Sequence, residues 1–164
     1  MFDVSAIGEI LIDFTPVGQS EAGHPLYEQN PGGGPPNMLA ACSRLGLSCA
    51  FAGRVGSDAF GVFLKDQLGA LGIDTSAVTE DPDVHTTLAF VHLDEKGGRS
   101  FSFYRKPGAD AMMSEQNTEL SAITRARIFH FSTVSMTSRC SRGANLAAVA
   151  AAKQKGAAIS FDPN

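Results

Sequence analysis

The sequence predicts an α/β domain in which a parallel, doubly wound sheet carries a small antiparallel β insertion. Short apolar runs alternate with helical patterns along most of the 164 residues, which is typical of a parallel sheet with helices on both faces. Two extended runs on either side of Asp94–Gly98 interrupt this alternation, and such a pair with glycines between its members predicts a hairpin. We therefore assign residues 1–74 and 109–164 to the α/β part and residues 75–108 to the insertion.

The first predicted strand and the first predicted helix flank a run of glycines. Residues 4–14 are mostly apolar and are interrupted by Gly8, Glu9 and Asp13, and a near-continuous apolar run predicts a strand that is buried on both faces. Residues 35–45 predict a short helix of small residues, because Pro is favoured in a first helical turn and Gly just after the last one.

A second strand and helix follow in the same order. Residues 48–54 predict the strand, and Asp58 is placed to cap the helix, since an Asp at that position accepts hydrogen bonds from free backbone N–H groups. The apolar residues of this helix recur at helical spacing, and Gly72 ends it. They are Phe60, Phe63, Leu64, Leu68 and Leu71.

The middle of the chain changes to the two-residue period of β-strands. Residues 86–93 and 99–105 are the two arms of the predicted hairpin. In the second arm Phe101 and Phe103 fall on one face and Tyr104 on the other, because successive side chains of a strand point to opposite sides. One face of the insertion is therefore expected to be apolar and the other to carry hydroxyl groups.

The last part of the chain returns to the α/β alternation. Residues 127–134 and 157–161 predict strands, and residues 138–155 predict an alanine-rich helix between them. Lys153 and Lys155 lie in the last turn of this helix, where a positive charge interacts favourably with the helix dipole.

Composition and charge exclude several classes of protein. A net charge of −4 argues against nucleic acid or an anionic membrane as the main partner. No apolar run approaches the ~20 residues that a membrane-spanning helix needs, and the N-terminus lacks the pattern of an export signal, so we expect a cytoplasmic protein. The three cysteines and four histidines lack metal-site spacing, so neither a disulfide framework nor a bound metal is predicted. The cysteines are Cys42, Cys49 and Cys140.

The glycine run is the strongest candidate for a ligand site. Gly32–Gly34 allow a ligand to approach the backbone closely, Pro36 suits the first turn of a helix, and the amide of Asn37 can both donate and accept hydrogen bonds. No Gly-Lys-Ser/Thr follows, and the glycines are consecutive, so the segment is neither a P-loop nor a GxGxxG turn. This arrangement suits a polyhydroxylated ligand.

The spacing of these residues resembles the first signature of the PfkB, or ribokinase-like, carbohydrate kinases. The resemblance covers almost the whole chain, and Leu39 departs from it where the family usually has a small residue. Two segments, Pro107–Asp110 and Phe161–Asn164, are similar to the fructokinase-like branch. The other matching positions are Gly8–Phe14, Gly32, Gly33, Asn37, Gly46, Arg54–Gly61, Thr86–Val91 and Ser100–Arg105.

The resemblance implies a ribokinase-like fold and a sugar site. It implies that Asp13, at the end of the first strand, accepts hydrogen bonds from sugar hydroxyls, while Gly32–Gly34 and Asn37 hold the other side of the sugar. It also implies that the insertion is a lid, which contributes an arginine to a polar substituent of the sugar and an aromatic ring to its face. The lid residues are Phe103, Tyr104 and Arg105.

The resemblance further implies ATP-dependent phosphorylation of a sugar's primary hydroxyl, with Mg²⁺. Asp162 and Asn164 resemble an Asp-x-Asn segment near the phosphates and metal. The catalytic base and the nucleotide pocket are expected beyond residue 164, so we expect this chain to carry the sugar-binding half, truncated before the C-terminal half, and to be inactive alone. Two alternatives remain: a 2-keto-3-deoxygluconate kinase, and a non-catalytic sugar-binding or dimerising module. A homodimer would form through the lid.

Overall fold

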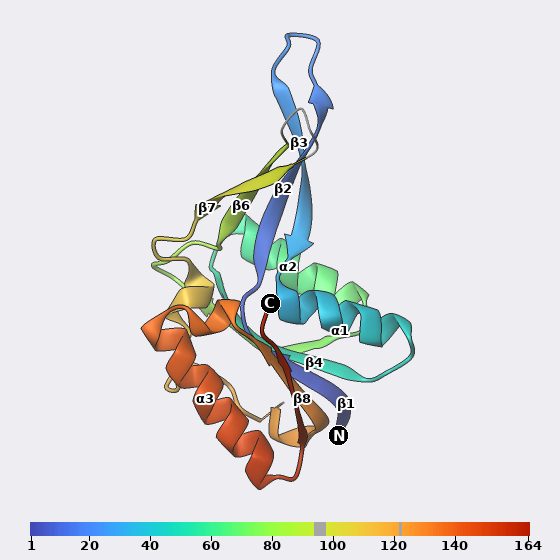
Figure 1. The fold of residues 1–164 in the computed structure, drawn as a ribbon, viewed down its shortest axis with the longest axis vertical. Helices are drawn as coiled ribbons and strands as arrows, with labels where there is room; N and C mark the ends of the chain where they lie inside the picture. The colour runs from blue at the N-terminus through green and yellow to red at the C-terminus, as the bar shows by residue number, and fades with distance from the viewer. Residues whose placement is uncertain (94–97, 122) are drawn as a thin grey trace.

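The computed structural model describes residues 1–93, 98–121 and 123–164, and it contains two sheets (Figure 1). One sheet is parallel and has five strands in the order β5-β4-β1-β8-β9, and the other has four strands in the order β3-β2-β6-β7. The predicted α/β class is confirmed. The parallel sheet consists of β1 (Phe2–Ile7), β4 (Cys49–Gly56), β5 (Asp74–Asp81), β8 (Ala126–Ser132) and β9 (Ala158–Asp162).

In the described part of the chain, three α-helices cover the two faces of the parallel sheet (Figure 1). Helices α1 (Gly34–Arg44) and α2 (Ala59–Ala70) pack on one face, and α3 (Arg139–Gln154) packs on the other. Each face has its own hydrophobic core, because alternate residues of each strand point to opposite sides. Leu39, Phe51 and Leu64 belong to the first core. Phe129 and Ala148 belong to the second.

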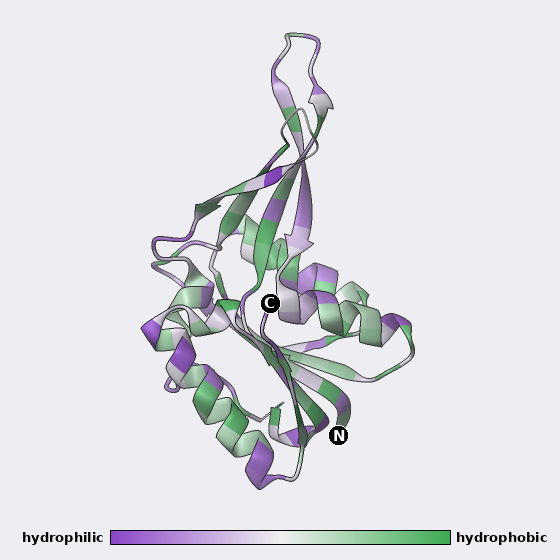
Figure 2. Cartoon of the chain, viewed as in Figure 1, coloured by the Kyte–Doolittle hydropathy of each residue, from purple (hydrophilic) through white to green (hydrophobic). Residues whose placement is uncertain are grey.

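The helices begin and end where the sequence predicted, to within two residues. Asp58 Oδ1 accepts a hydrogen bond of 2.9 Å from the Gly61 N–H and so caps α2 as expected. Gly46 follows α1 with a φ of 86°, a conformation that glycine adopts without steric cost. Figure 2 shows hydrophobic and hydrophilic residues alternating along α3, as expected of a helix with one buried side.

The second sheet, which we call the mixed sheet, extends away from the parallel sheet (Figure 1). Its β6–β7 pair is antiparallel, which confirms the predicted hairpin, although residues 94–97 of the turn lie outside the described residues. The β2–β3 pair is also antiparallel, and β2 pairs with β6 in parallel. The four strands are β2 (Leu11–Gln19), β3 (Pro25–Gly32), β6 (Leu88–Leu93) and β7 (Arg99–Tyr104).

The structure corrects the predicted first strand. The apolar run of residues 4–14 is two strands, because β1 ends at Ile7 and β2 begins at Leu11 in the other sheet. Both strands are buried near their junction, so hydrophobicity alone does not show the break. Gly8 marks it, since a Cβ at this position would lie 2.7 Å from Pro35 Cγ.

The structure also changes the predicted boundaries of the insertion. The prediction that residues 75–108 form it is wrong at its start, because β5 pairs in parallel with β4 at the edge of the main sheet. Residues 11–32, which we assigned to the α/β part, supply two strands of the mixed sheet instead. Among the described residues, no helix is long and apolar enough to cross a membrane.

Candidate functional site

The candidate site lies where the two sheets meet. Strands β1, β4, β8 and β9 are parallel, so their C-terminal ends share one edge of the sheet. The chain leaves this edge after β1 to enter the mixed sheet, and it returns from Gly32 of β3 into α1 (Figure 1). Ligands of open α/β sheets bind at this edge.

The glycine turn between β3 and α1 is closely packed against the start of the mixed sheet. Gly33 is the N-cap residue of α1 and has a φ of 119°. A Cβ on Gly33 would lie 2.5 Å from the backbone oxygen of Glu9. The N–H of Asn37 donates to the Gly33 carbonyl at 3.2 Å. The predicted turn is therefore present, and glycine is required at position 33 by both conformation and space.

Glu9 holds this turn, although its sequence context did not mark it as a site residue. Its side chain lies under the turn, and the residue is only 2% exposed. Its Oε1 accepts a hydrogen bond of 3.0 Å from the Gly34 N–H, and its Oε2 accepts one of 3.2 Å from Ser132 Oγ. Burial raises the pKa of Glu9, and the nearby charge of Asp110 raises it further. The sequence feature that could have identified Glu9 is its charge inside the apolar run of residues 4–14.

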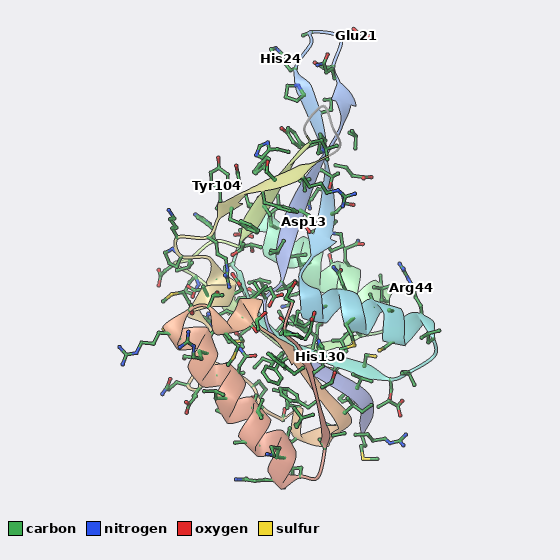
Figure 3. All side chains as sticks on the ribbon, viewed as in Figure 1. Asp13, Glu21, His24, Arg44, Tyr104 and His130 are labelled. Atoms are coloured by element: carbon green, nitrogen blue, oxygen red, sulfur yellow. The ribbon has the colours of Figure 1, made fainter. Side chains whose placement is uncertain are left out.

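Asp13 lies next to the turn, but in β2 rather than at the end of the first strand, which corrects the predicted position (Figure 3). A Cβ on Gly32 would overlap the Asp13 carboxylate, so the glycine makes room for it. The side chain is partly buried, and burial raises the pKa of Asp13. Within residues 1–93, 98–121 and 123–164, the carboxylate has no hydrogen bond or ion pair.

Arg105 stands at the base of the mixed sheet with its charge already paired. Its Nε donates to Asp110 Oδ2 at 2.9 Å, and its Nη2 lies 2.6 Å from the same oxygen. Its Nη1 donates to Thr137 Oγ1 at 3.2 Å. Asp110 is 2% exposed and also accepts from Thr87 Oγ1. Arg105 therefore joins the mixed sheet to the segment that precedes α3.

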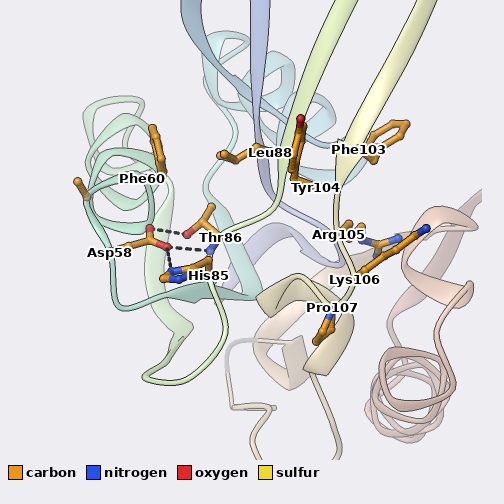
Figure 4. A pocket seen from close by; sticks show the side chains of 11 residues that line it. Asp58, Phe60, His85, Thr86, Leu88, Phe103, Tyr104, Arg105, Lys106 and Pro107 are labelled. Carbon is orange, nitrogen blue, oxygen red and sulfur yellow. Dashed lines mark hydrogen bonds and ion pairs between the residues drawn. The ribbon is translucent and has the colours of Figure 1, made fainter.

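The two aromatic lid residues lie on opposite faces of the mixed sheet. Asp13 pairs with Ala89, and Ala89 pairs with Phe103. Phe103 is therefore on the same face as Asp13, because directly paired residues share a face. Tyr104 is on the other face, where its ring lies 5.6 Å from that of Phe90. Figure 4 shows the two side chains pointing away from each other across β7.

The predicted site residues line three separate hollows. One, of about 760 Å³, is lined by Phe60, His85, Leu88 and Tyr104, and also by the predicted residues Phe103 and Arg105 (Figure 4). Leu88 and Tyr104 belong to the face of the mixed sheet opposite Asp13. A second, of about 430 Å³, includes Gly32 and Asn37 and lies between α1 and α2. The third, of about 300 Å³, includes Asp13, Val91 and Phe101. The structure does not bring all the predicted residues into one cavity.

Asp162 and Asn164 lie at the same edge of the parallel sheet, at the end of β9. Asp162 is level with Ser132 in the neighbouring strand, and its carbonyl accepts from the Thr133 N–H at 3.1 Å. The N–H of Asn164 donates to Asp162 Oδ1 at 2.9 Å. Among the described residues, no group of three or more His, Cys, Asp or Glu is arranged to hold a metal ion.

Comparison with known proteins agrees with the fold. The model of the pfkB family of carbohydrate kinases matches residues 1–164. Fructokinase-2 of Oryza sativa subsp. japonica is 42% identical over 163 residues, which are 98% of this chain and 48% of that protein. The crystal structure of fructokinase from Xylella fastidiosa superposes with a TM-score of 0.92 at 36% identity, covering 100% of this chain and 51% of that one.

A further structure bears on the nucleotide. A protein from Escherichia coli, assigned as a ribokinase II and solved in complex with ATP and Mg²⁺, superposes with a TM-score of 0.89 at 31% identity. It covers 100% of this chain and 53% of that one. The chain thus spans about half the length of the curated relatives it matches. Because the family model covers every residue, the chain belongs to the pfkB family of carbohydrate kinases.

Proposed function

We propose that the whole protein is a fructokinase-type sugar kinase, and that this chain supplies its sugar-binding half. The reaction would transfer the terminal phosphoryl group of ATP, as its Mg²⁺ complex, to a primary hydroxyl of fructose. The matched proteins support the sugar, since the rice relative and the Xylella structure are fructokinases. The E. coli structure with ATP and Mg²⁺ supports the phosphoryl donor.

The observation that carries this proposal is the environment of Asp13. A partly buried carboxylate with no donor in the described part of the chain has lost water without gaining a partner, which is unfavourable unless a ligand supplies the donors. Sugar hydroxyls are suitable donors, and hydrogen bonds to a carboxylate are stronger than those between neutral groups. Gly32–Gly34 would let the sugar approach the backbone, and Phe103, on the same face, would cover its ring.

A neutral sugar suits the site better than a sugar acid. A 2-keto-3-deoxy acid would require a cation for its carboxylate, and Arg105 is the arginine at the base of the mixed sheet. Asp110 already neutralises Arg105 through two close contacts. Asp13 and Glu9 add further negative charge at this edge. Arg99 also lines the hollow that includes Asp13, but the acidic groups outnumber it at this edge and favour fructose over 2-keto-3-deoxygluconate.

Fewer residues of this chain are proposed to act on the phosphoryl side of the reaction. We propose that Asp162 and Asn164, at the end of β9, face the phosphates of the nucleotide, as the family resemblance implies. The catalytic base is not assigned to any residue of this chain. It would remove the proton from the attacking hydroxyl as phosphoryl transfer begins.

We also propose that the protein forms a homodimer through the mixed sheet. All six residues of β7 are exposed, and β7 is an edge strand with unpaired backbone groups, a common site of association. Phe101 and Phe103 stack on its surface with their ring centres 5.9 Å apart. A cytoplasmic location is our proposal for the cell, supported by the three free thiols, which reducing compartments maintain.

Calorimetric titration of the chain with fructose tests the proposed sugar site. Asp13→Asn keeps the size of the side chain but removes the charge, so we expect fructose affinity to fall by about tenfold to a hundredfold, the range for a lost hydrogen bond to a charged group. Asp66→Asn, on the exposed surface of α2, is the matched control and should bind as the unmodified chain does. Equal affinity in the Asp13→Asn and Asp66→Asn variants would contradict the assignment of Asp13.

A further inference from the structure

A buried carboxylate that the family resemblance does not assign to the sugar lies directly under the glycine turn. We propose that Glu9 is a positioning residue, which fixes the Gly33–Gly34 turn in its binding conformation and ties it to the root of the mixed sheet. The expected effect of Glu9 on sugar affinity rests on the proposed function, whereas its effect on the conformation of the Gly33–Gly34 turn does not.

The N-terminus of α1 obtains its hydrogen-bond acceptor from Glu9. A helix leaves its first N–H groups without partners inside the helix. Here Pro35 and Pro36 have no N–H, and the N–H of Asn37 already donates to Gly33. The N–H of Gly34 remains, and no side chain of the N-cap residue reaches it. Glu9 Oε1 accepts it at 3.0 Å, so a residue far away in sequence performs the capping.

The position of Glu9 in the chain connects the turn to both sheets. Glu9 lies between Ile7, the end of β1, and Leu11, the start of β2, where the chain passes from one sheet to the other. Its carboxylate also accepts from Ser132 Oγ at the end of β8, and its own carbonyl fills the space beside Gly33. One residue therefore contacts the link between the sheets, the glycine turn and the edge of the parallel sheet.

A buried charge at this position has an energetic cost that its hydrogen bonds must offset. A carboxylate 2% exposed is unfavourable unless it is hydrogen-bonded, and the charge of nearby Asp110 adds to the cost. An apolar residue would avoid this cost but could not accept the Gly34 N–H. A glutamine would accept from Gly34 through its carbonyl and donate to Ser132 through its amide. The site therefore requires an acceptor of this length.

Two variants and a control test the proposal in the full 164-residue chain. Glu9→Gln retains the acceptor, and Glu9→Ala removes it. Asp81→Asn is the matched control, because Asp81 is another buried carboxylate, accepts from the N–H groups of Asp83 and Val84, and ends the edge strand two strands away from β1. All four chains are examined by NMR and then titrated with fructose.

The first measurement is hydrogen exchange of the Gly34 amide without sugar. We expect the alanine variant to exchange at least about tenfold faster, as loss of a hydrogen bond to a charged group predicts. The glutamine variant and the control should exchange as the unmodified chain does. In the titration, Glu9→Ala should weaken fructose binding by about tenfold or more, and Glu9→Gln should restore it to within about threefold.

Unchanged exchange at Gly34 in a folded Glu9→Ala chain would overturn the proposal, and so would fructose affinity equal to that of the unmodified chain. If the alanine variant does not fold, the glutamine variant decides: protected Gly34 and retained affinity support positioning, and loss of either overturns it. If the unmodified chain binds no fructose, the proposed function fails, and the exchange of Gly34 alone then decides the role of Glu9.

Discussion

Two acidic residues at the junction of the sheets have unlike environments and unlike proposed roles. Glu9 is almost fully buried and accepts hydrogen bonds from Gly34 and Ser132. Asp13 is partly buried and accepts none from the described residues. The first carboxylate is therefore committed to the protein, and the second is available to a ligand. Burial raises the pKa of both groups.

The raised pKa of Glu9 predicts a pH effect on stability. A carboxyl whose pKa is higher in the folded state keeps its proton to higher pH there, so its contribution to folding is greatest below the pKa of the unfolded chain and is lost as pH rises through the folded value. Glu9→Gln has no such loss. The variant should therefore gain stability relative to the unmodified chain between about pH 4 and neutrality.

Urea unfolding at a series of pH values measures this difference. Despite burial, hydrogen bonds lower the pKa values of Asp58 and Asp81, so these residues change stability with pH in the opposite direction. Both residues are present in both chains, so their contributions cancel in the difference between the two unfolding free energies. A difference in unfolding free energy that does not change with pH would show that Glu9 has the same pKa in the folded and unfolded chain.

Single residues of the site were predictable from sequence to different degrees. The turn at Gly32–Gly34 and the helix that follows it were predicted correctly, because glycine and proline have strong local preferences. That these glycines and Asn37 bind sugar stays a prediction. Glu9 was not selected, because one charge in an apolar run does not show which element it contacts. The opposite orientations of Phe103 and Tyr104 follow from their alternation in a strand, but which of them shares a face with Asp13 required the register between strands.

At the scale of elements, the helices and inner strands were predictable and the strands of the second sheet only partly so. Helix α2 has both a capping residue and helical spacing of apolar residues. Strand β3 contains Pro, Asn and Glu, which are depleted in strands, so it was missed. Strand β5 is polar because it forms an edge of the parallel sheet. The split between β1 and β2 depends on tertiary pairing, which apolar content does not encode.

The cap of α2 gives a prediction at this scale. Asp58 accepts hydrogen bonds from the Gly61 N–H, the Thr86 N–H and the Thr86 hydroxyl, at 2.8 to 2.9 Å. Asp58→Ala should lower the free energy of unfolding by about 3 kcal/mol, since a lost N-cap costs about 1 and each of the two lost part-buried hydrogen bonds from Thr86 about 1 more. Urea unfolding measures it, with Asp66→Ala on the same helix as the control. A loss no larger than that of the control would contradict the cap's contribution.

The exposed edge of the mixed sheet gives a second prediction. If the protein dimerises there, Phe101→Ser should weaken association, because it removes an exposed aromatic ring from β7. Leu146→Ser, which removes an exposed apolar side chain from α3, should leave association unchanged. Sedimentation velocity compares the two. A dimer that resists Phe101→Ser, or a chain that is monomeric throughout, would contradict the proposal.

For the whole molecule, the arrangement of the two sheets separates the hollow that includes Asp13 from the one around Phe60 and His85. The fold class was predictable because alternating strands and helices have few packing solutions. The position of the mixed sheet over the C-terminal edge was not, since it results from pairing between strands that are far apart in the sequence. The hollow around Phe60 and His85, at about 760 Å³, is larger than the one of about 300 Å³ that includes Asp13, and Leu88 and Tyr104 line it from the opposite face of the mixed sheet. Size alone would therefore select a different site from the one that the chemistry supports.

The most direct test of the proposed sugar site is an NMR titration of the isotope-labelled chain with fructose. We predict amide shifts at Gly32–Gly34, Asn37 and Asp13, with saturation, and none beyond background at His85 and Thr86 in the hollow of about 760 Å³. Glucitol, which lacks a carbonyl carbon, serves as a control for non-specific polyol effects. Shifts confined to the hollow around His85, or no saturable shifts at the glycine turn, would contradict the assignment of the sugar site.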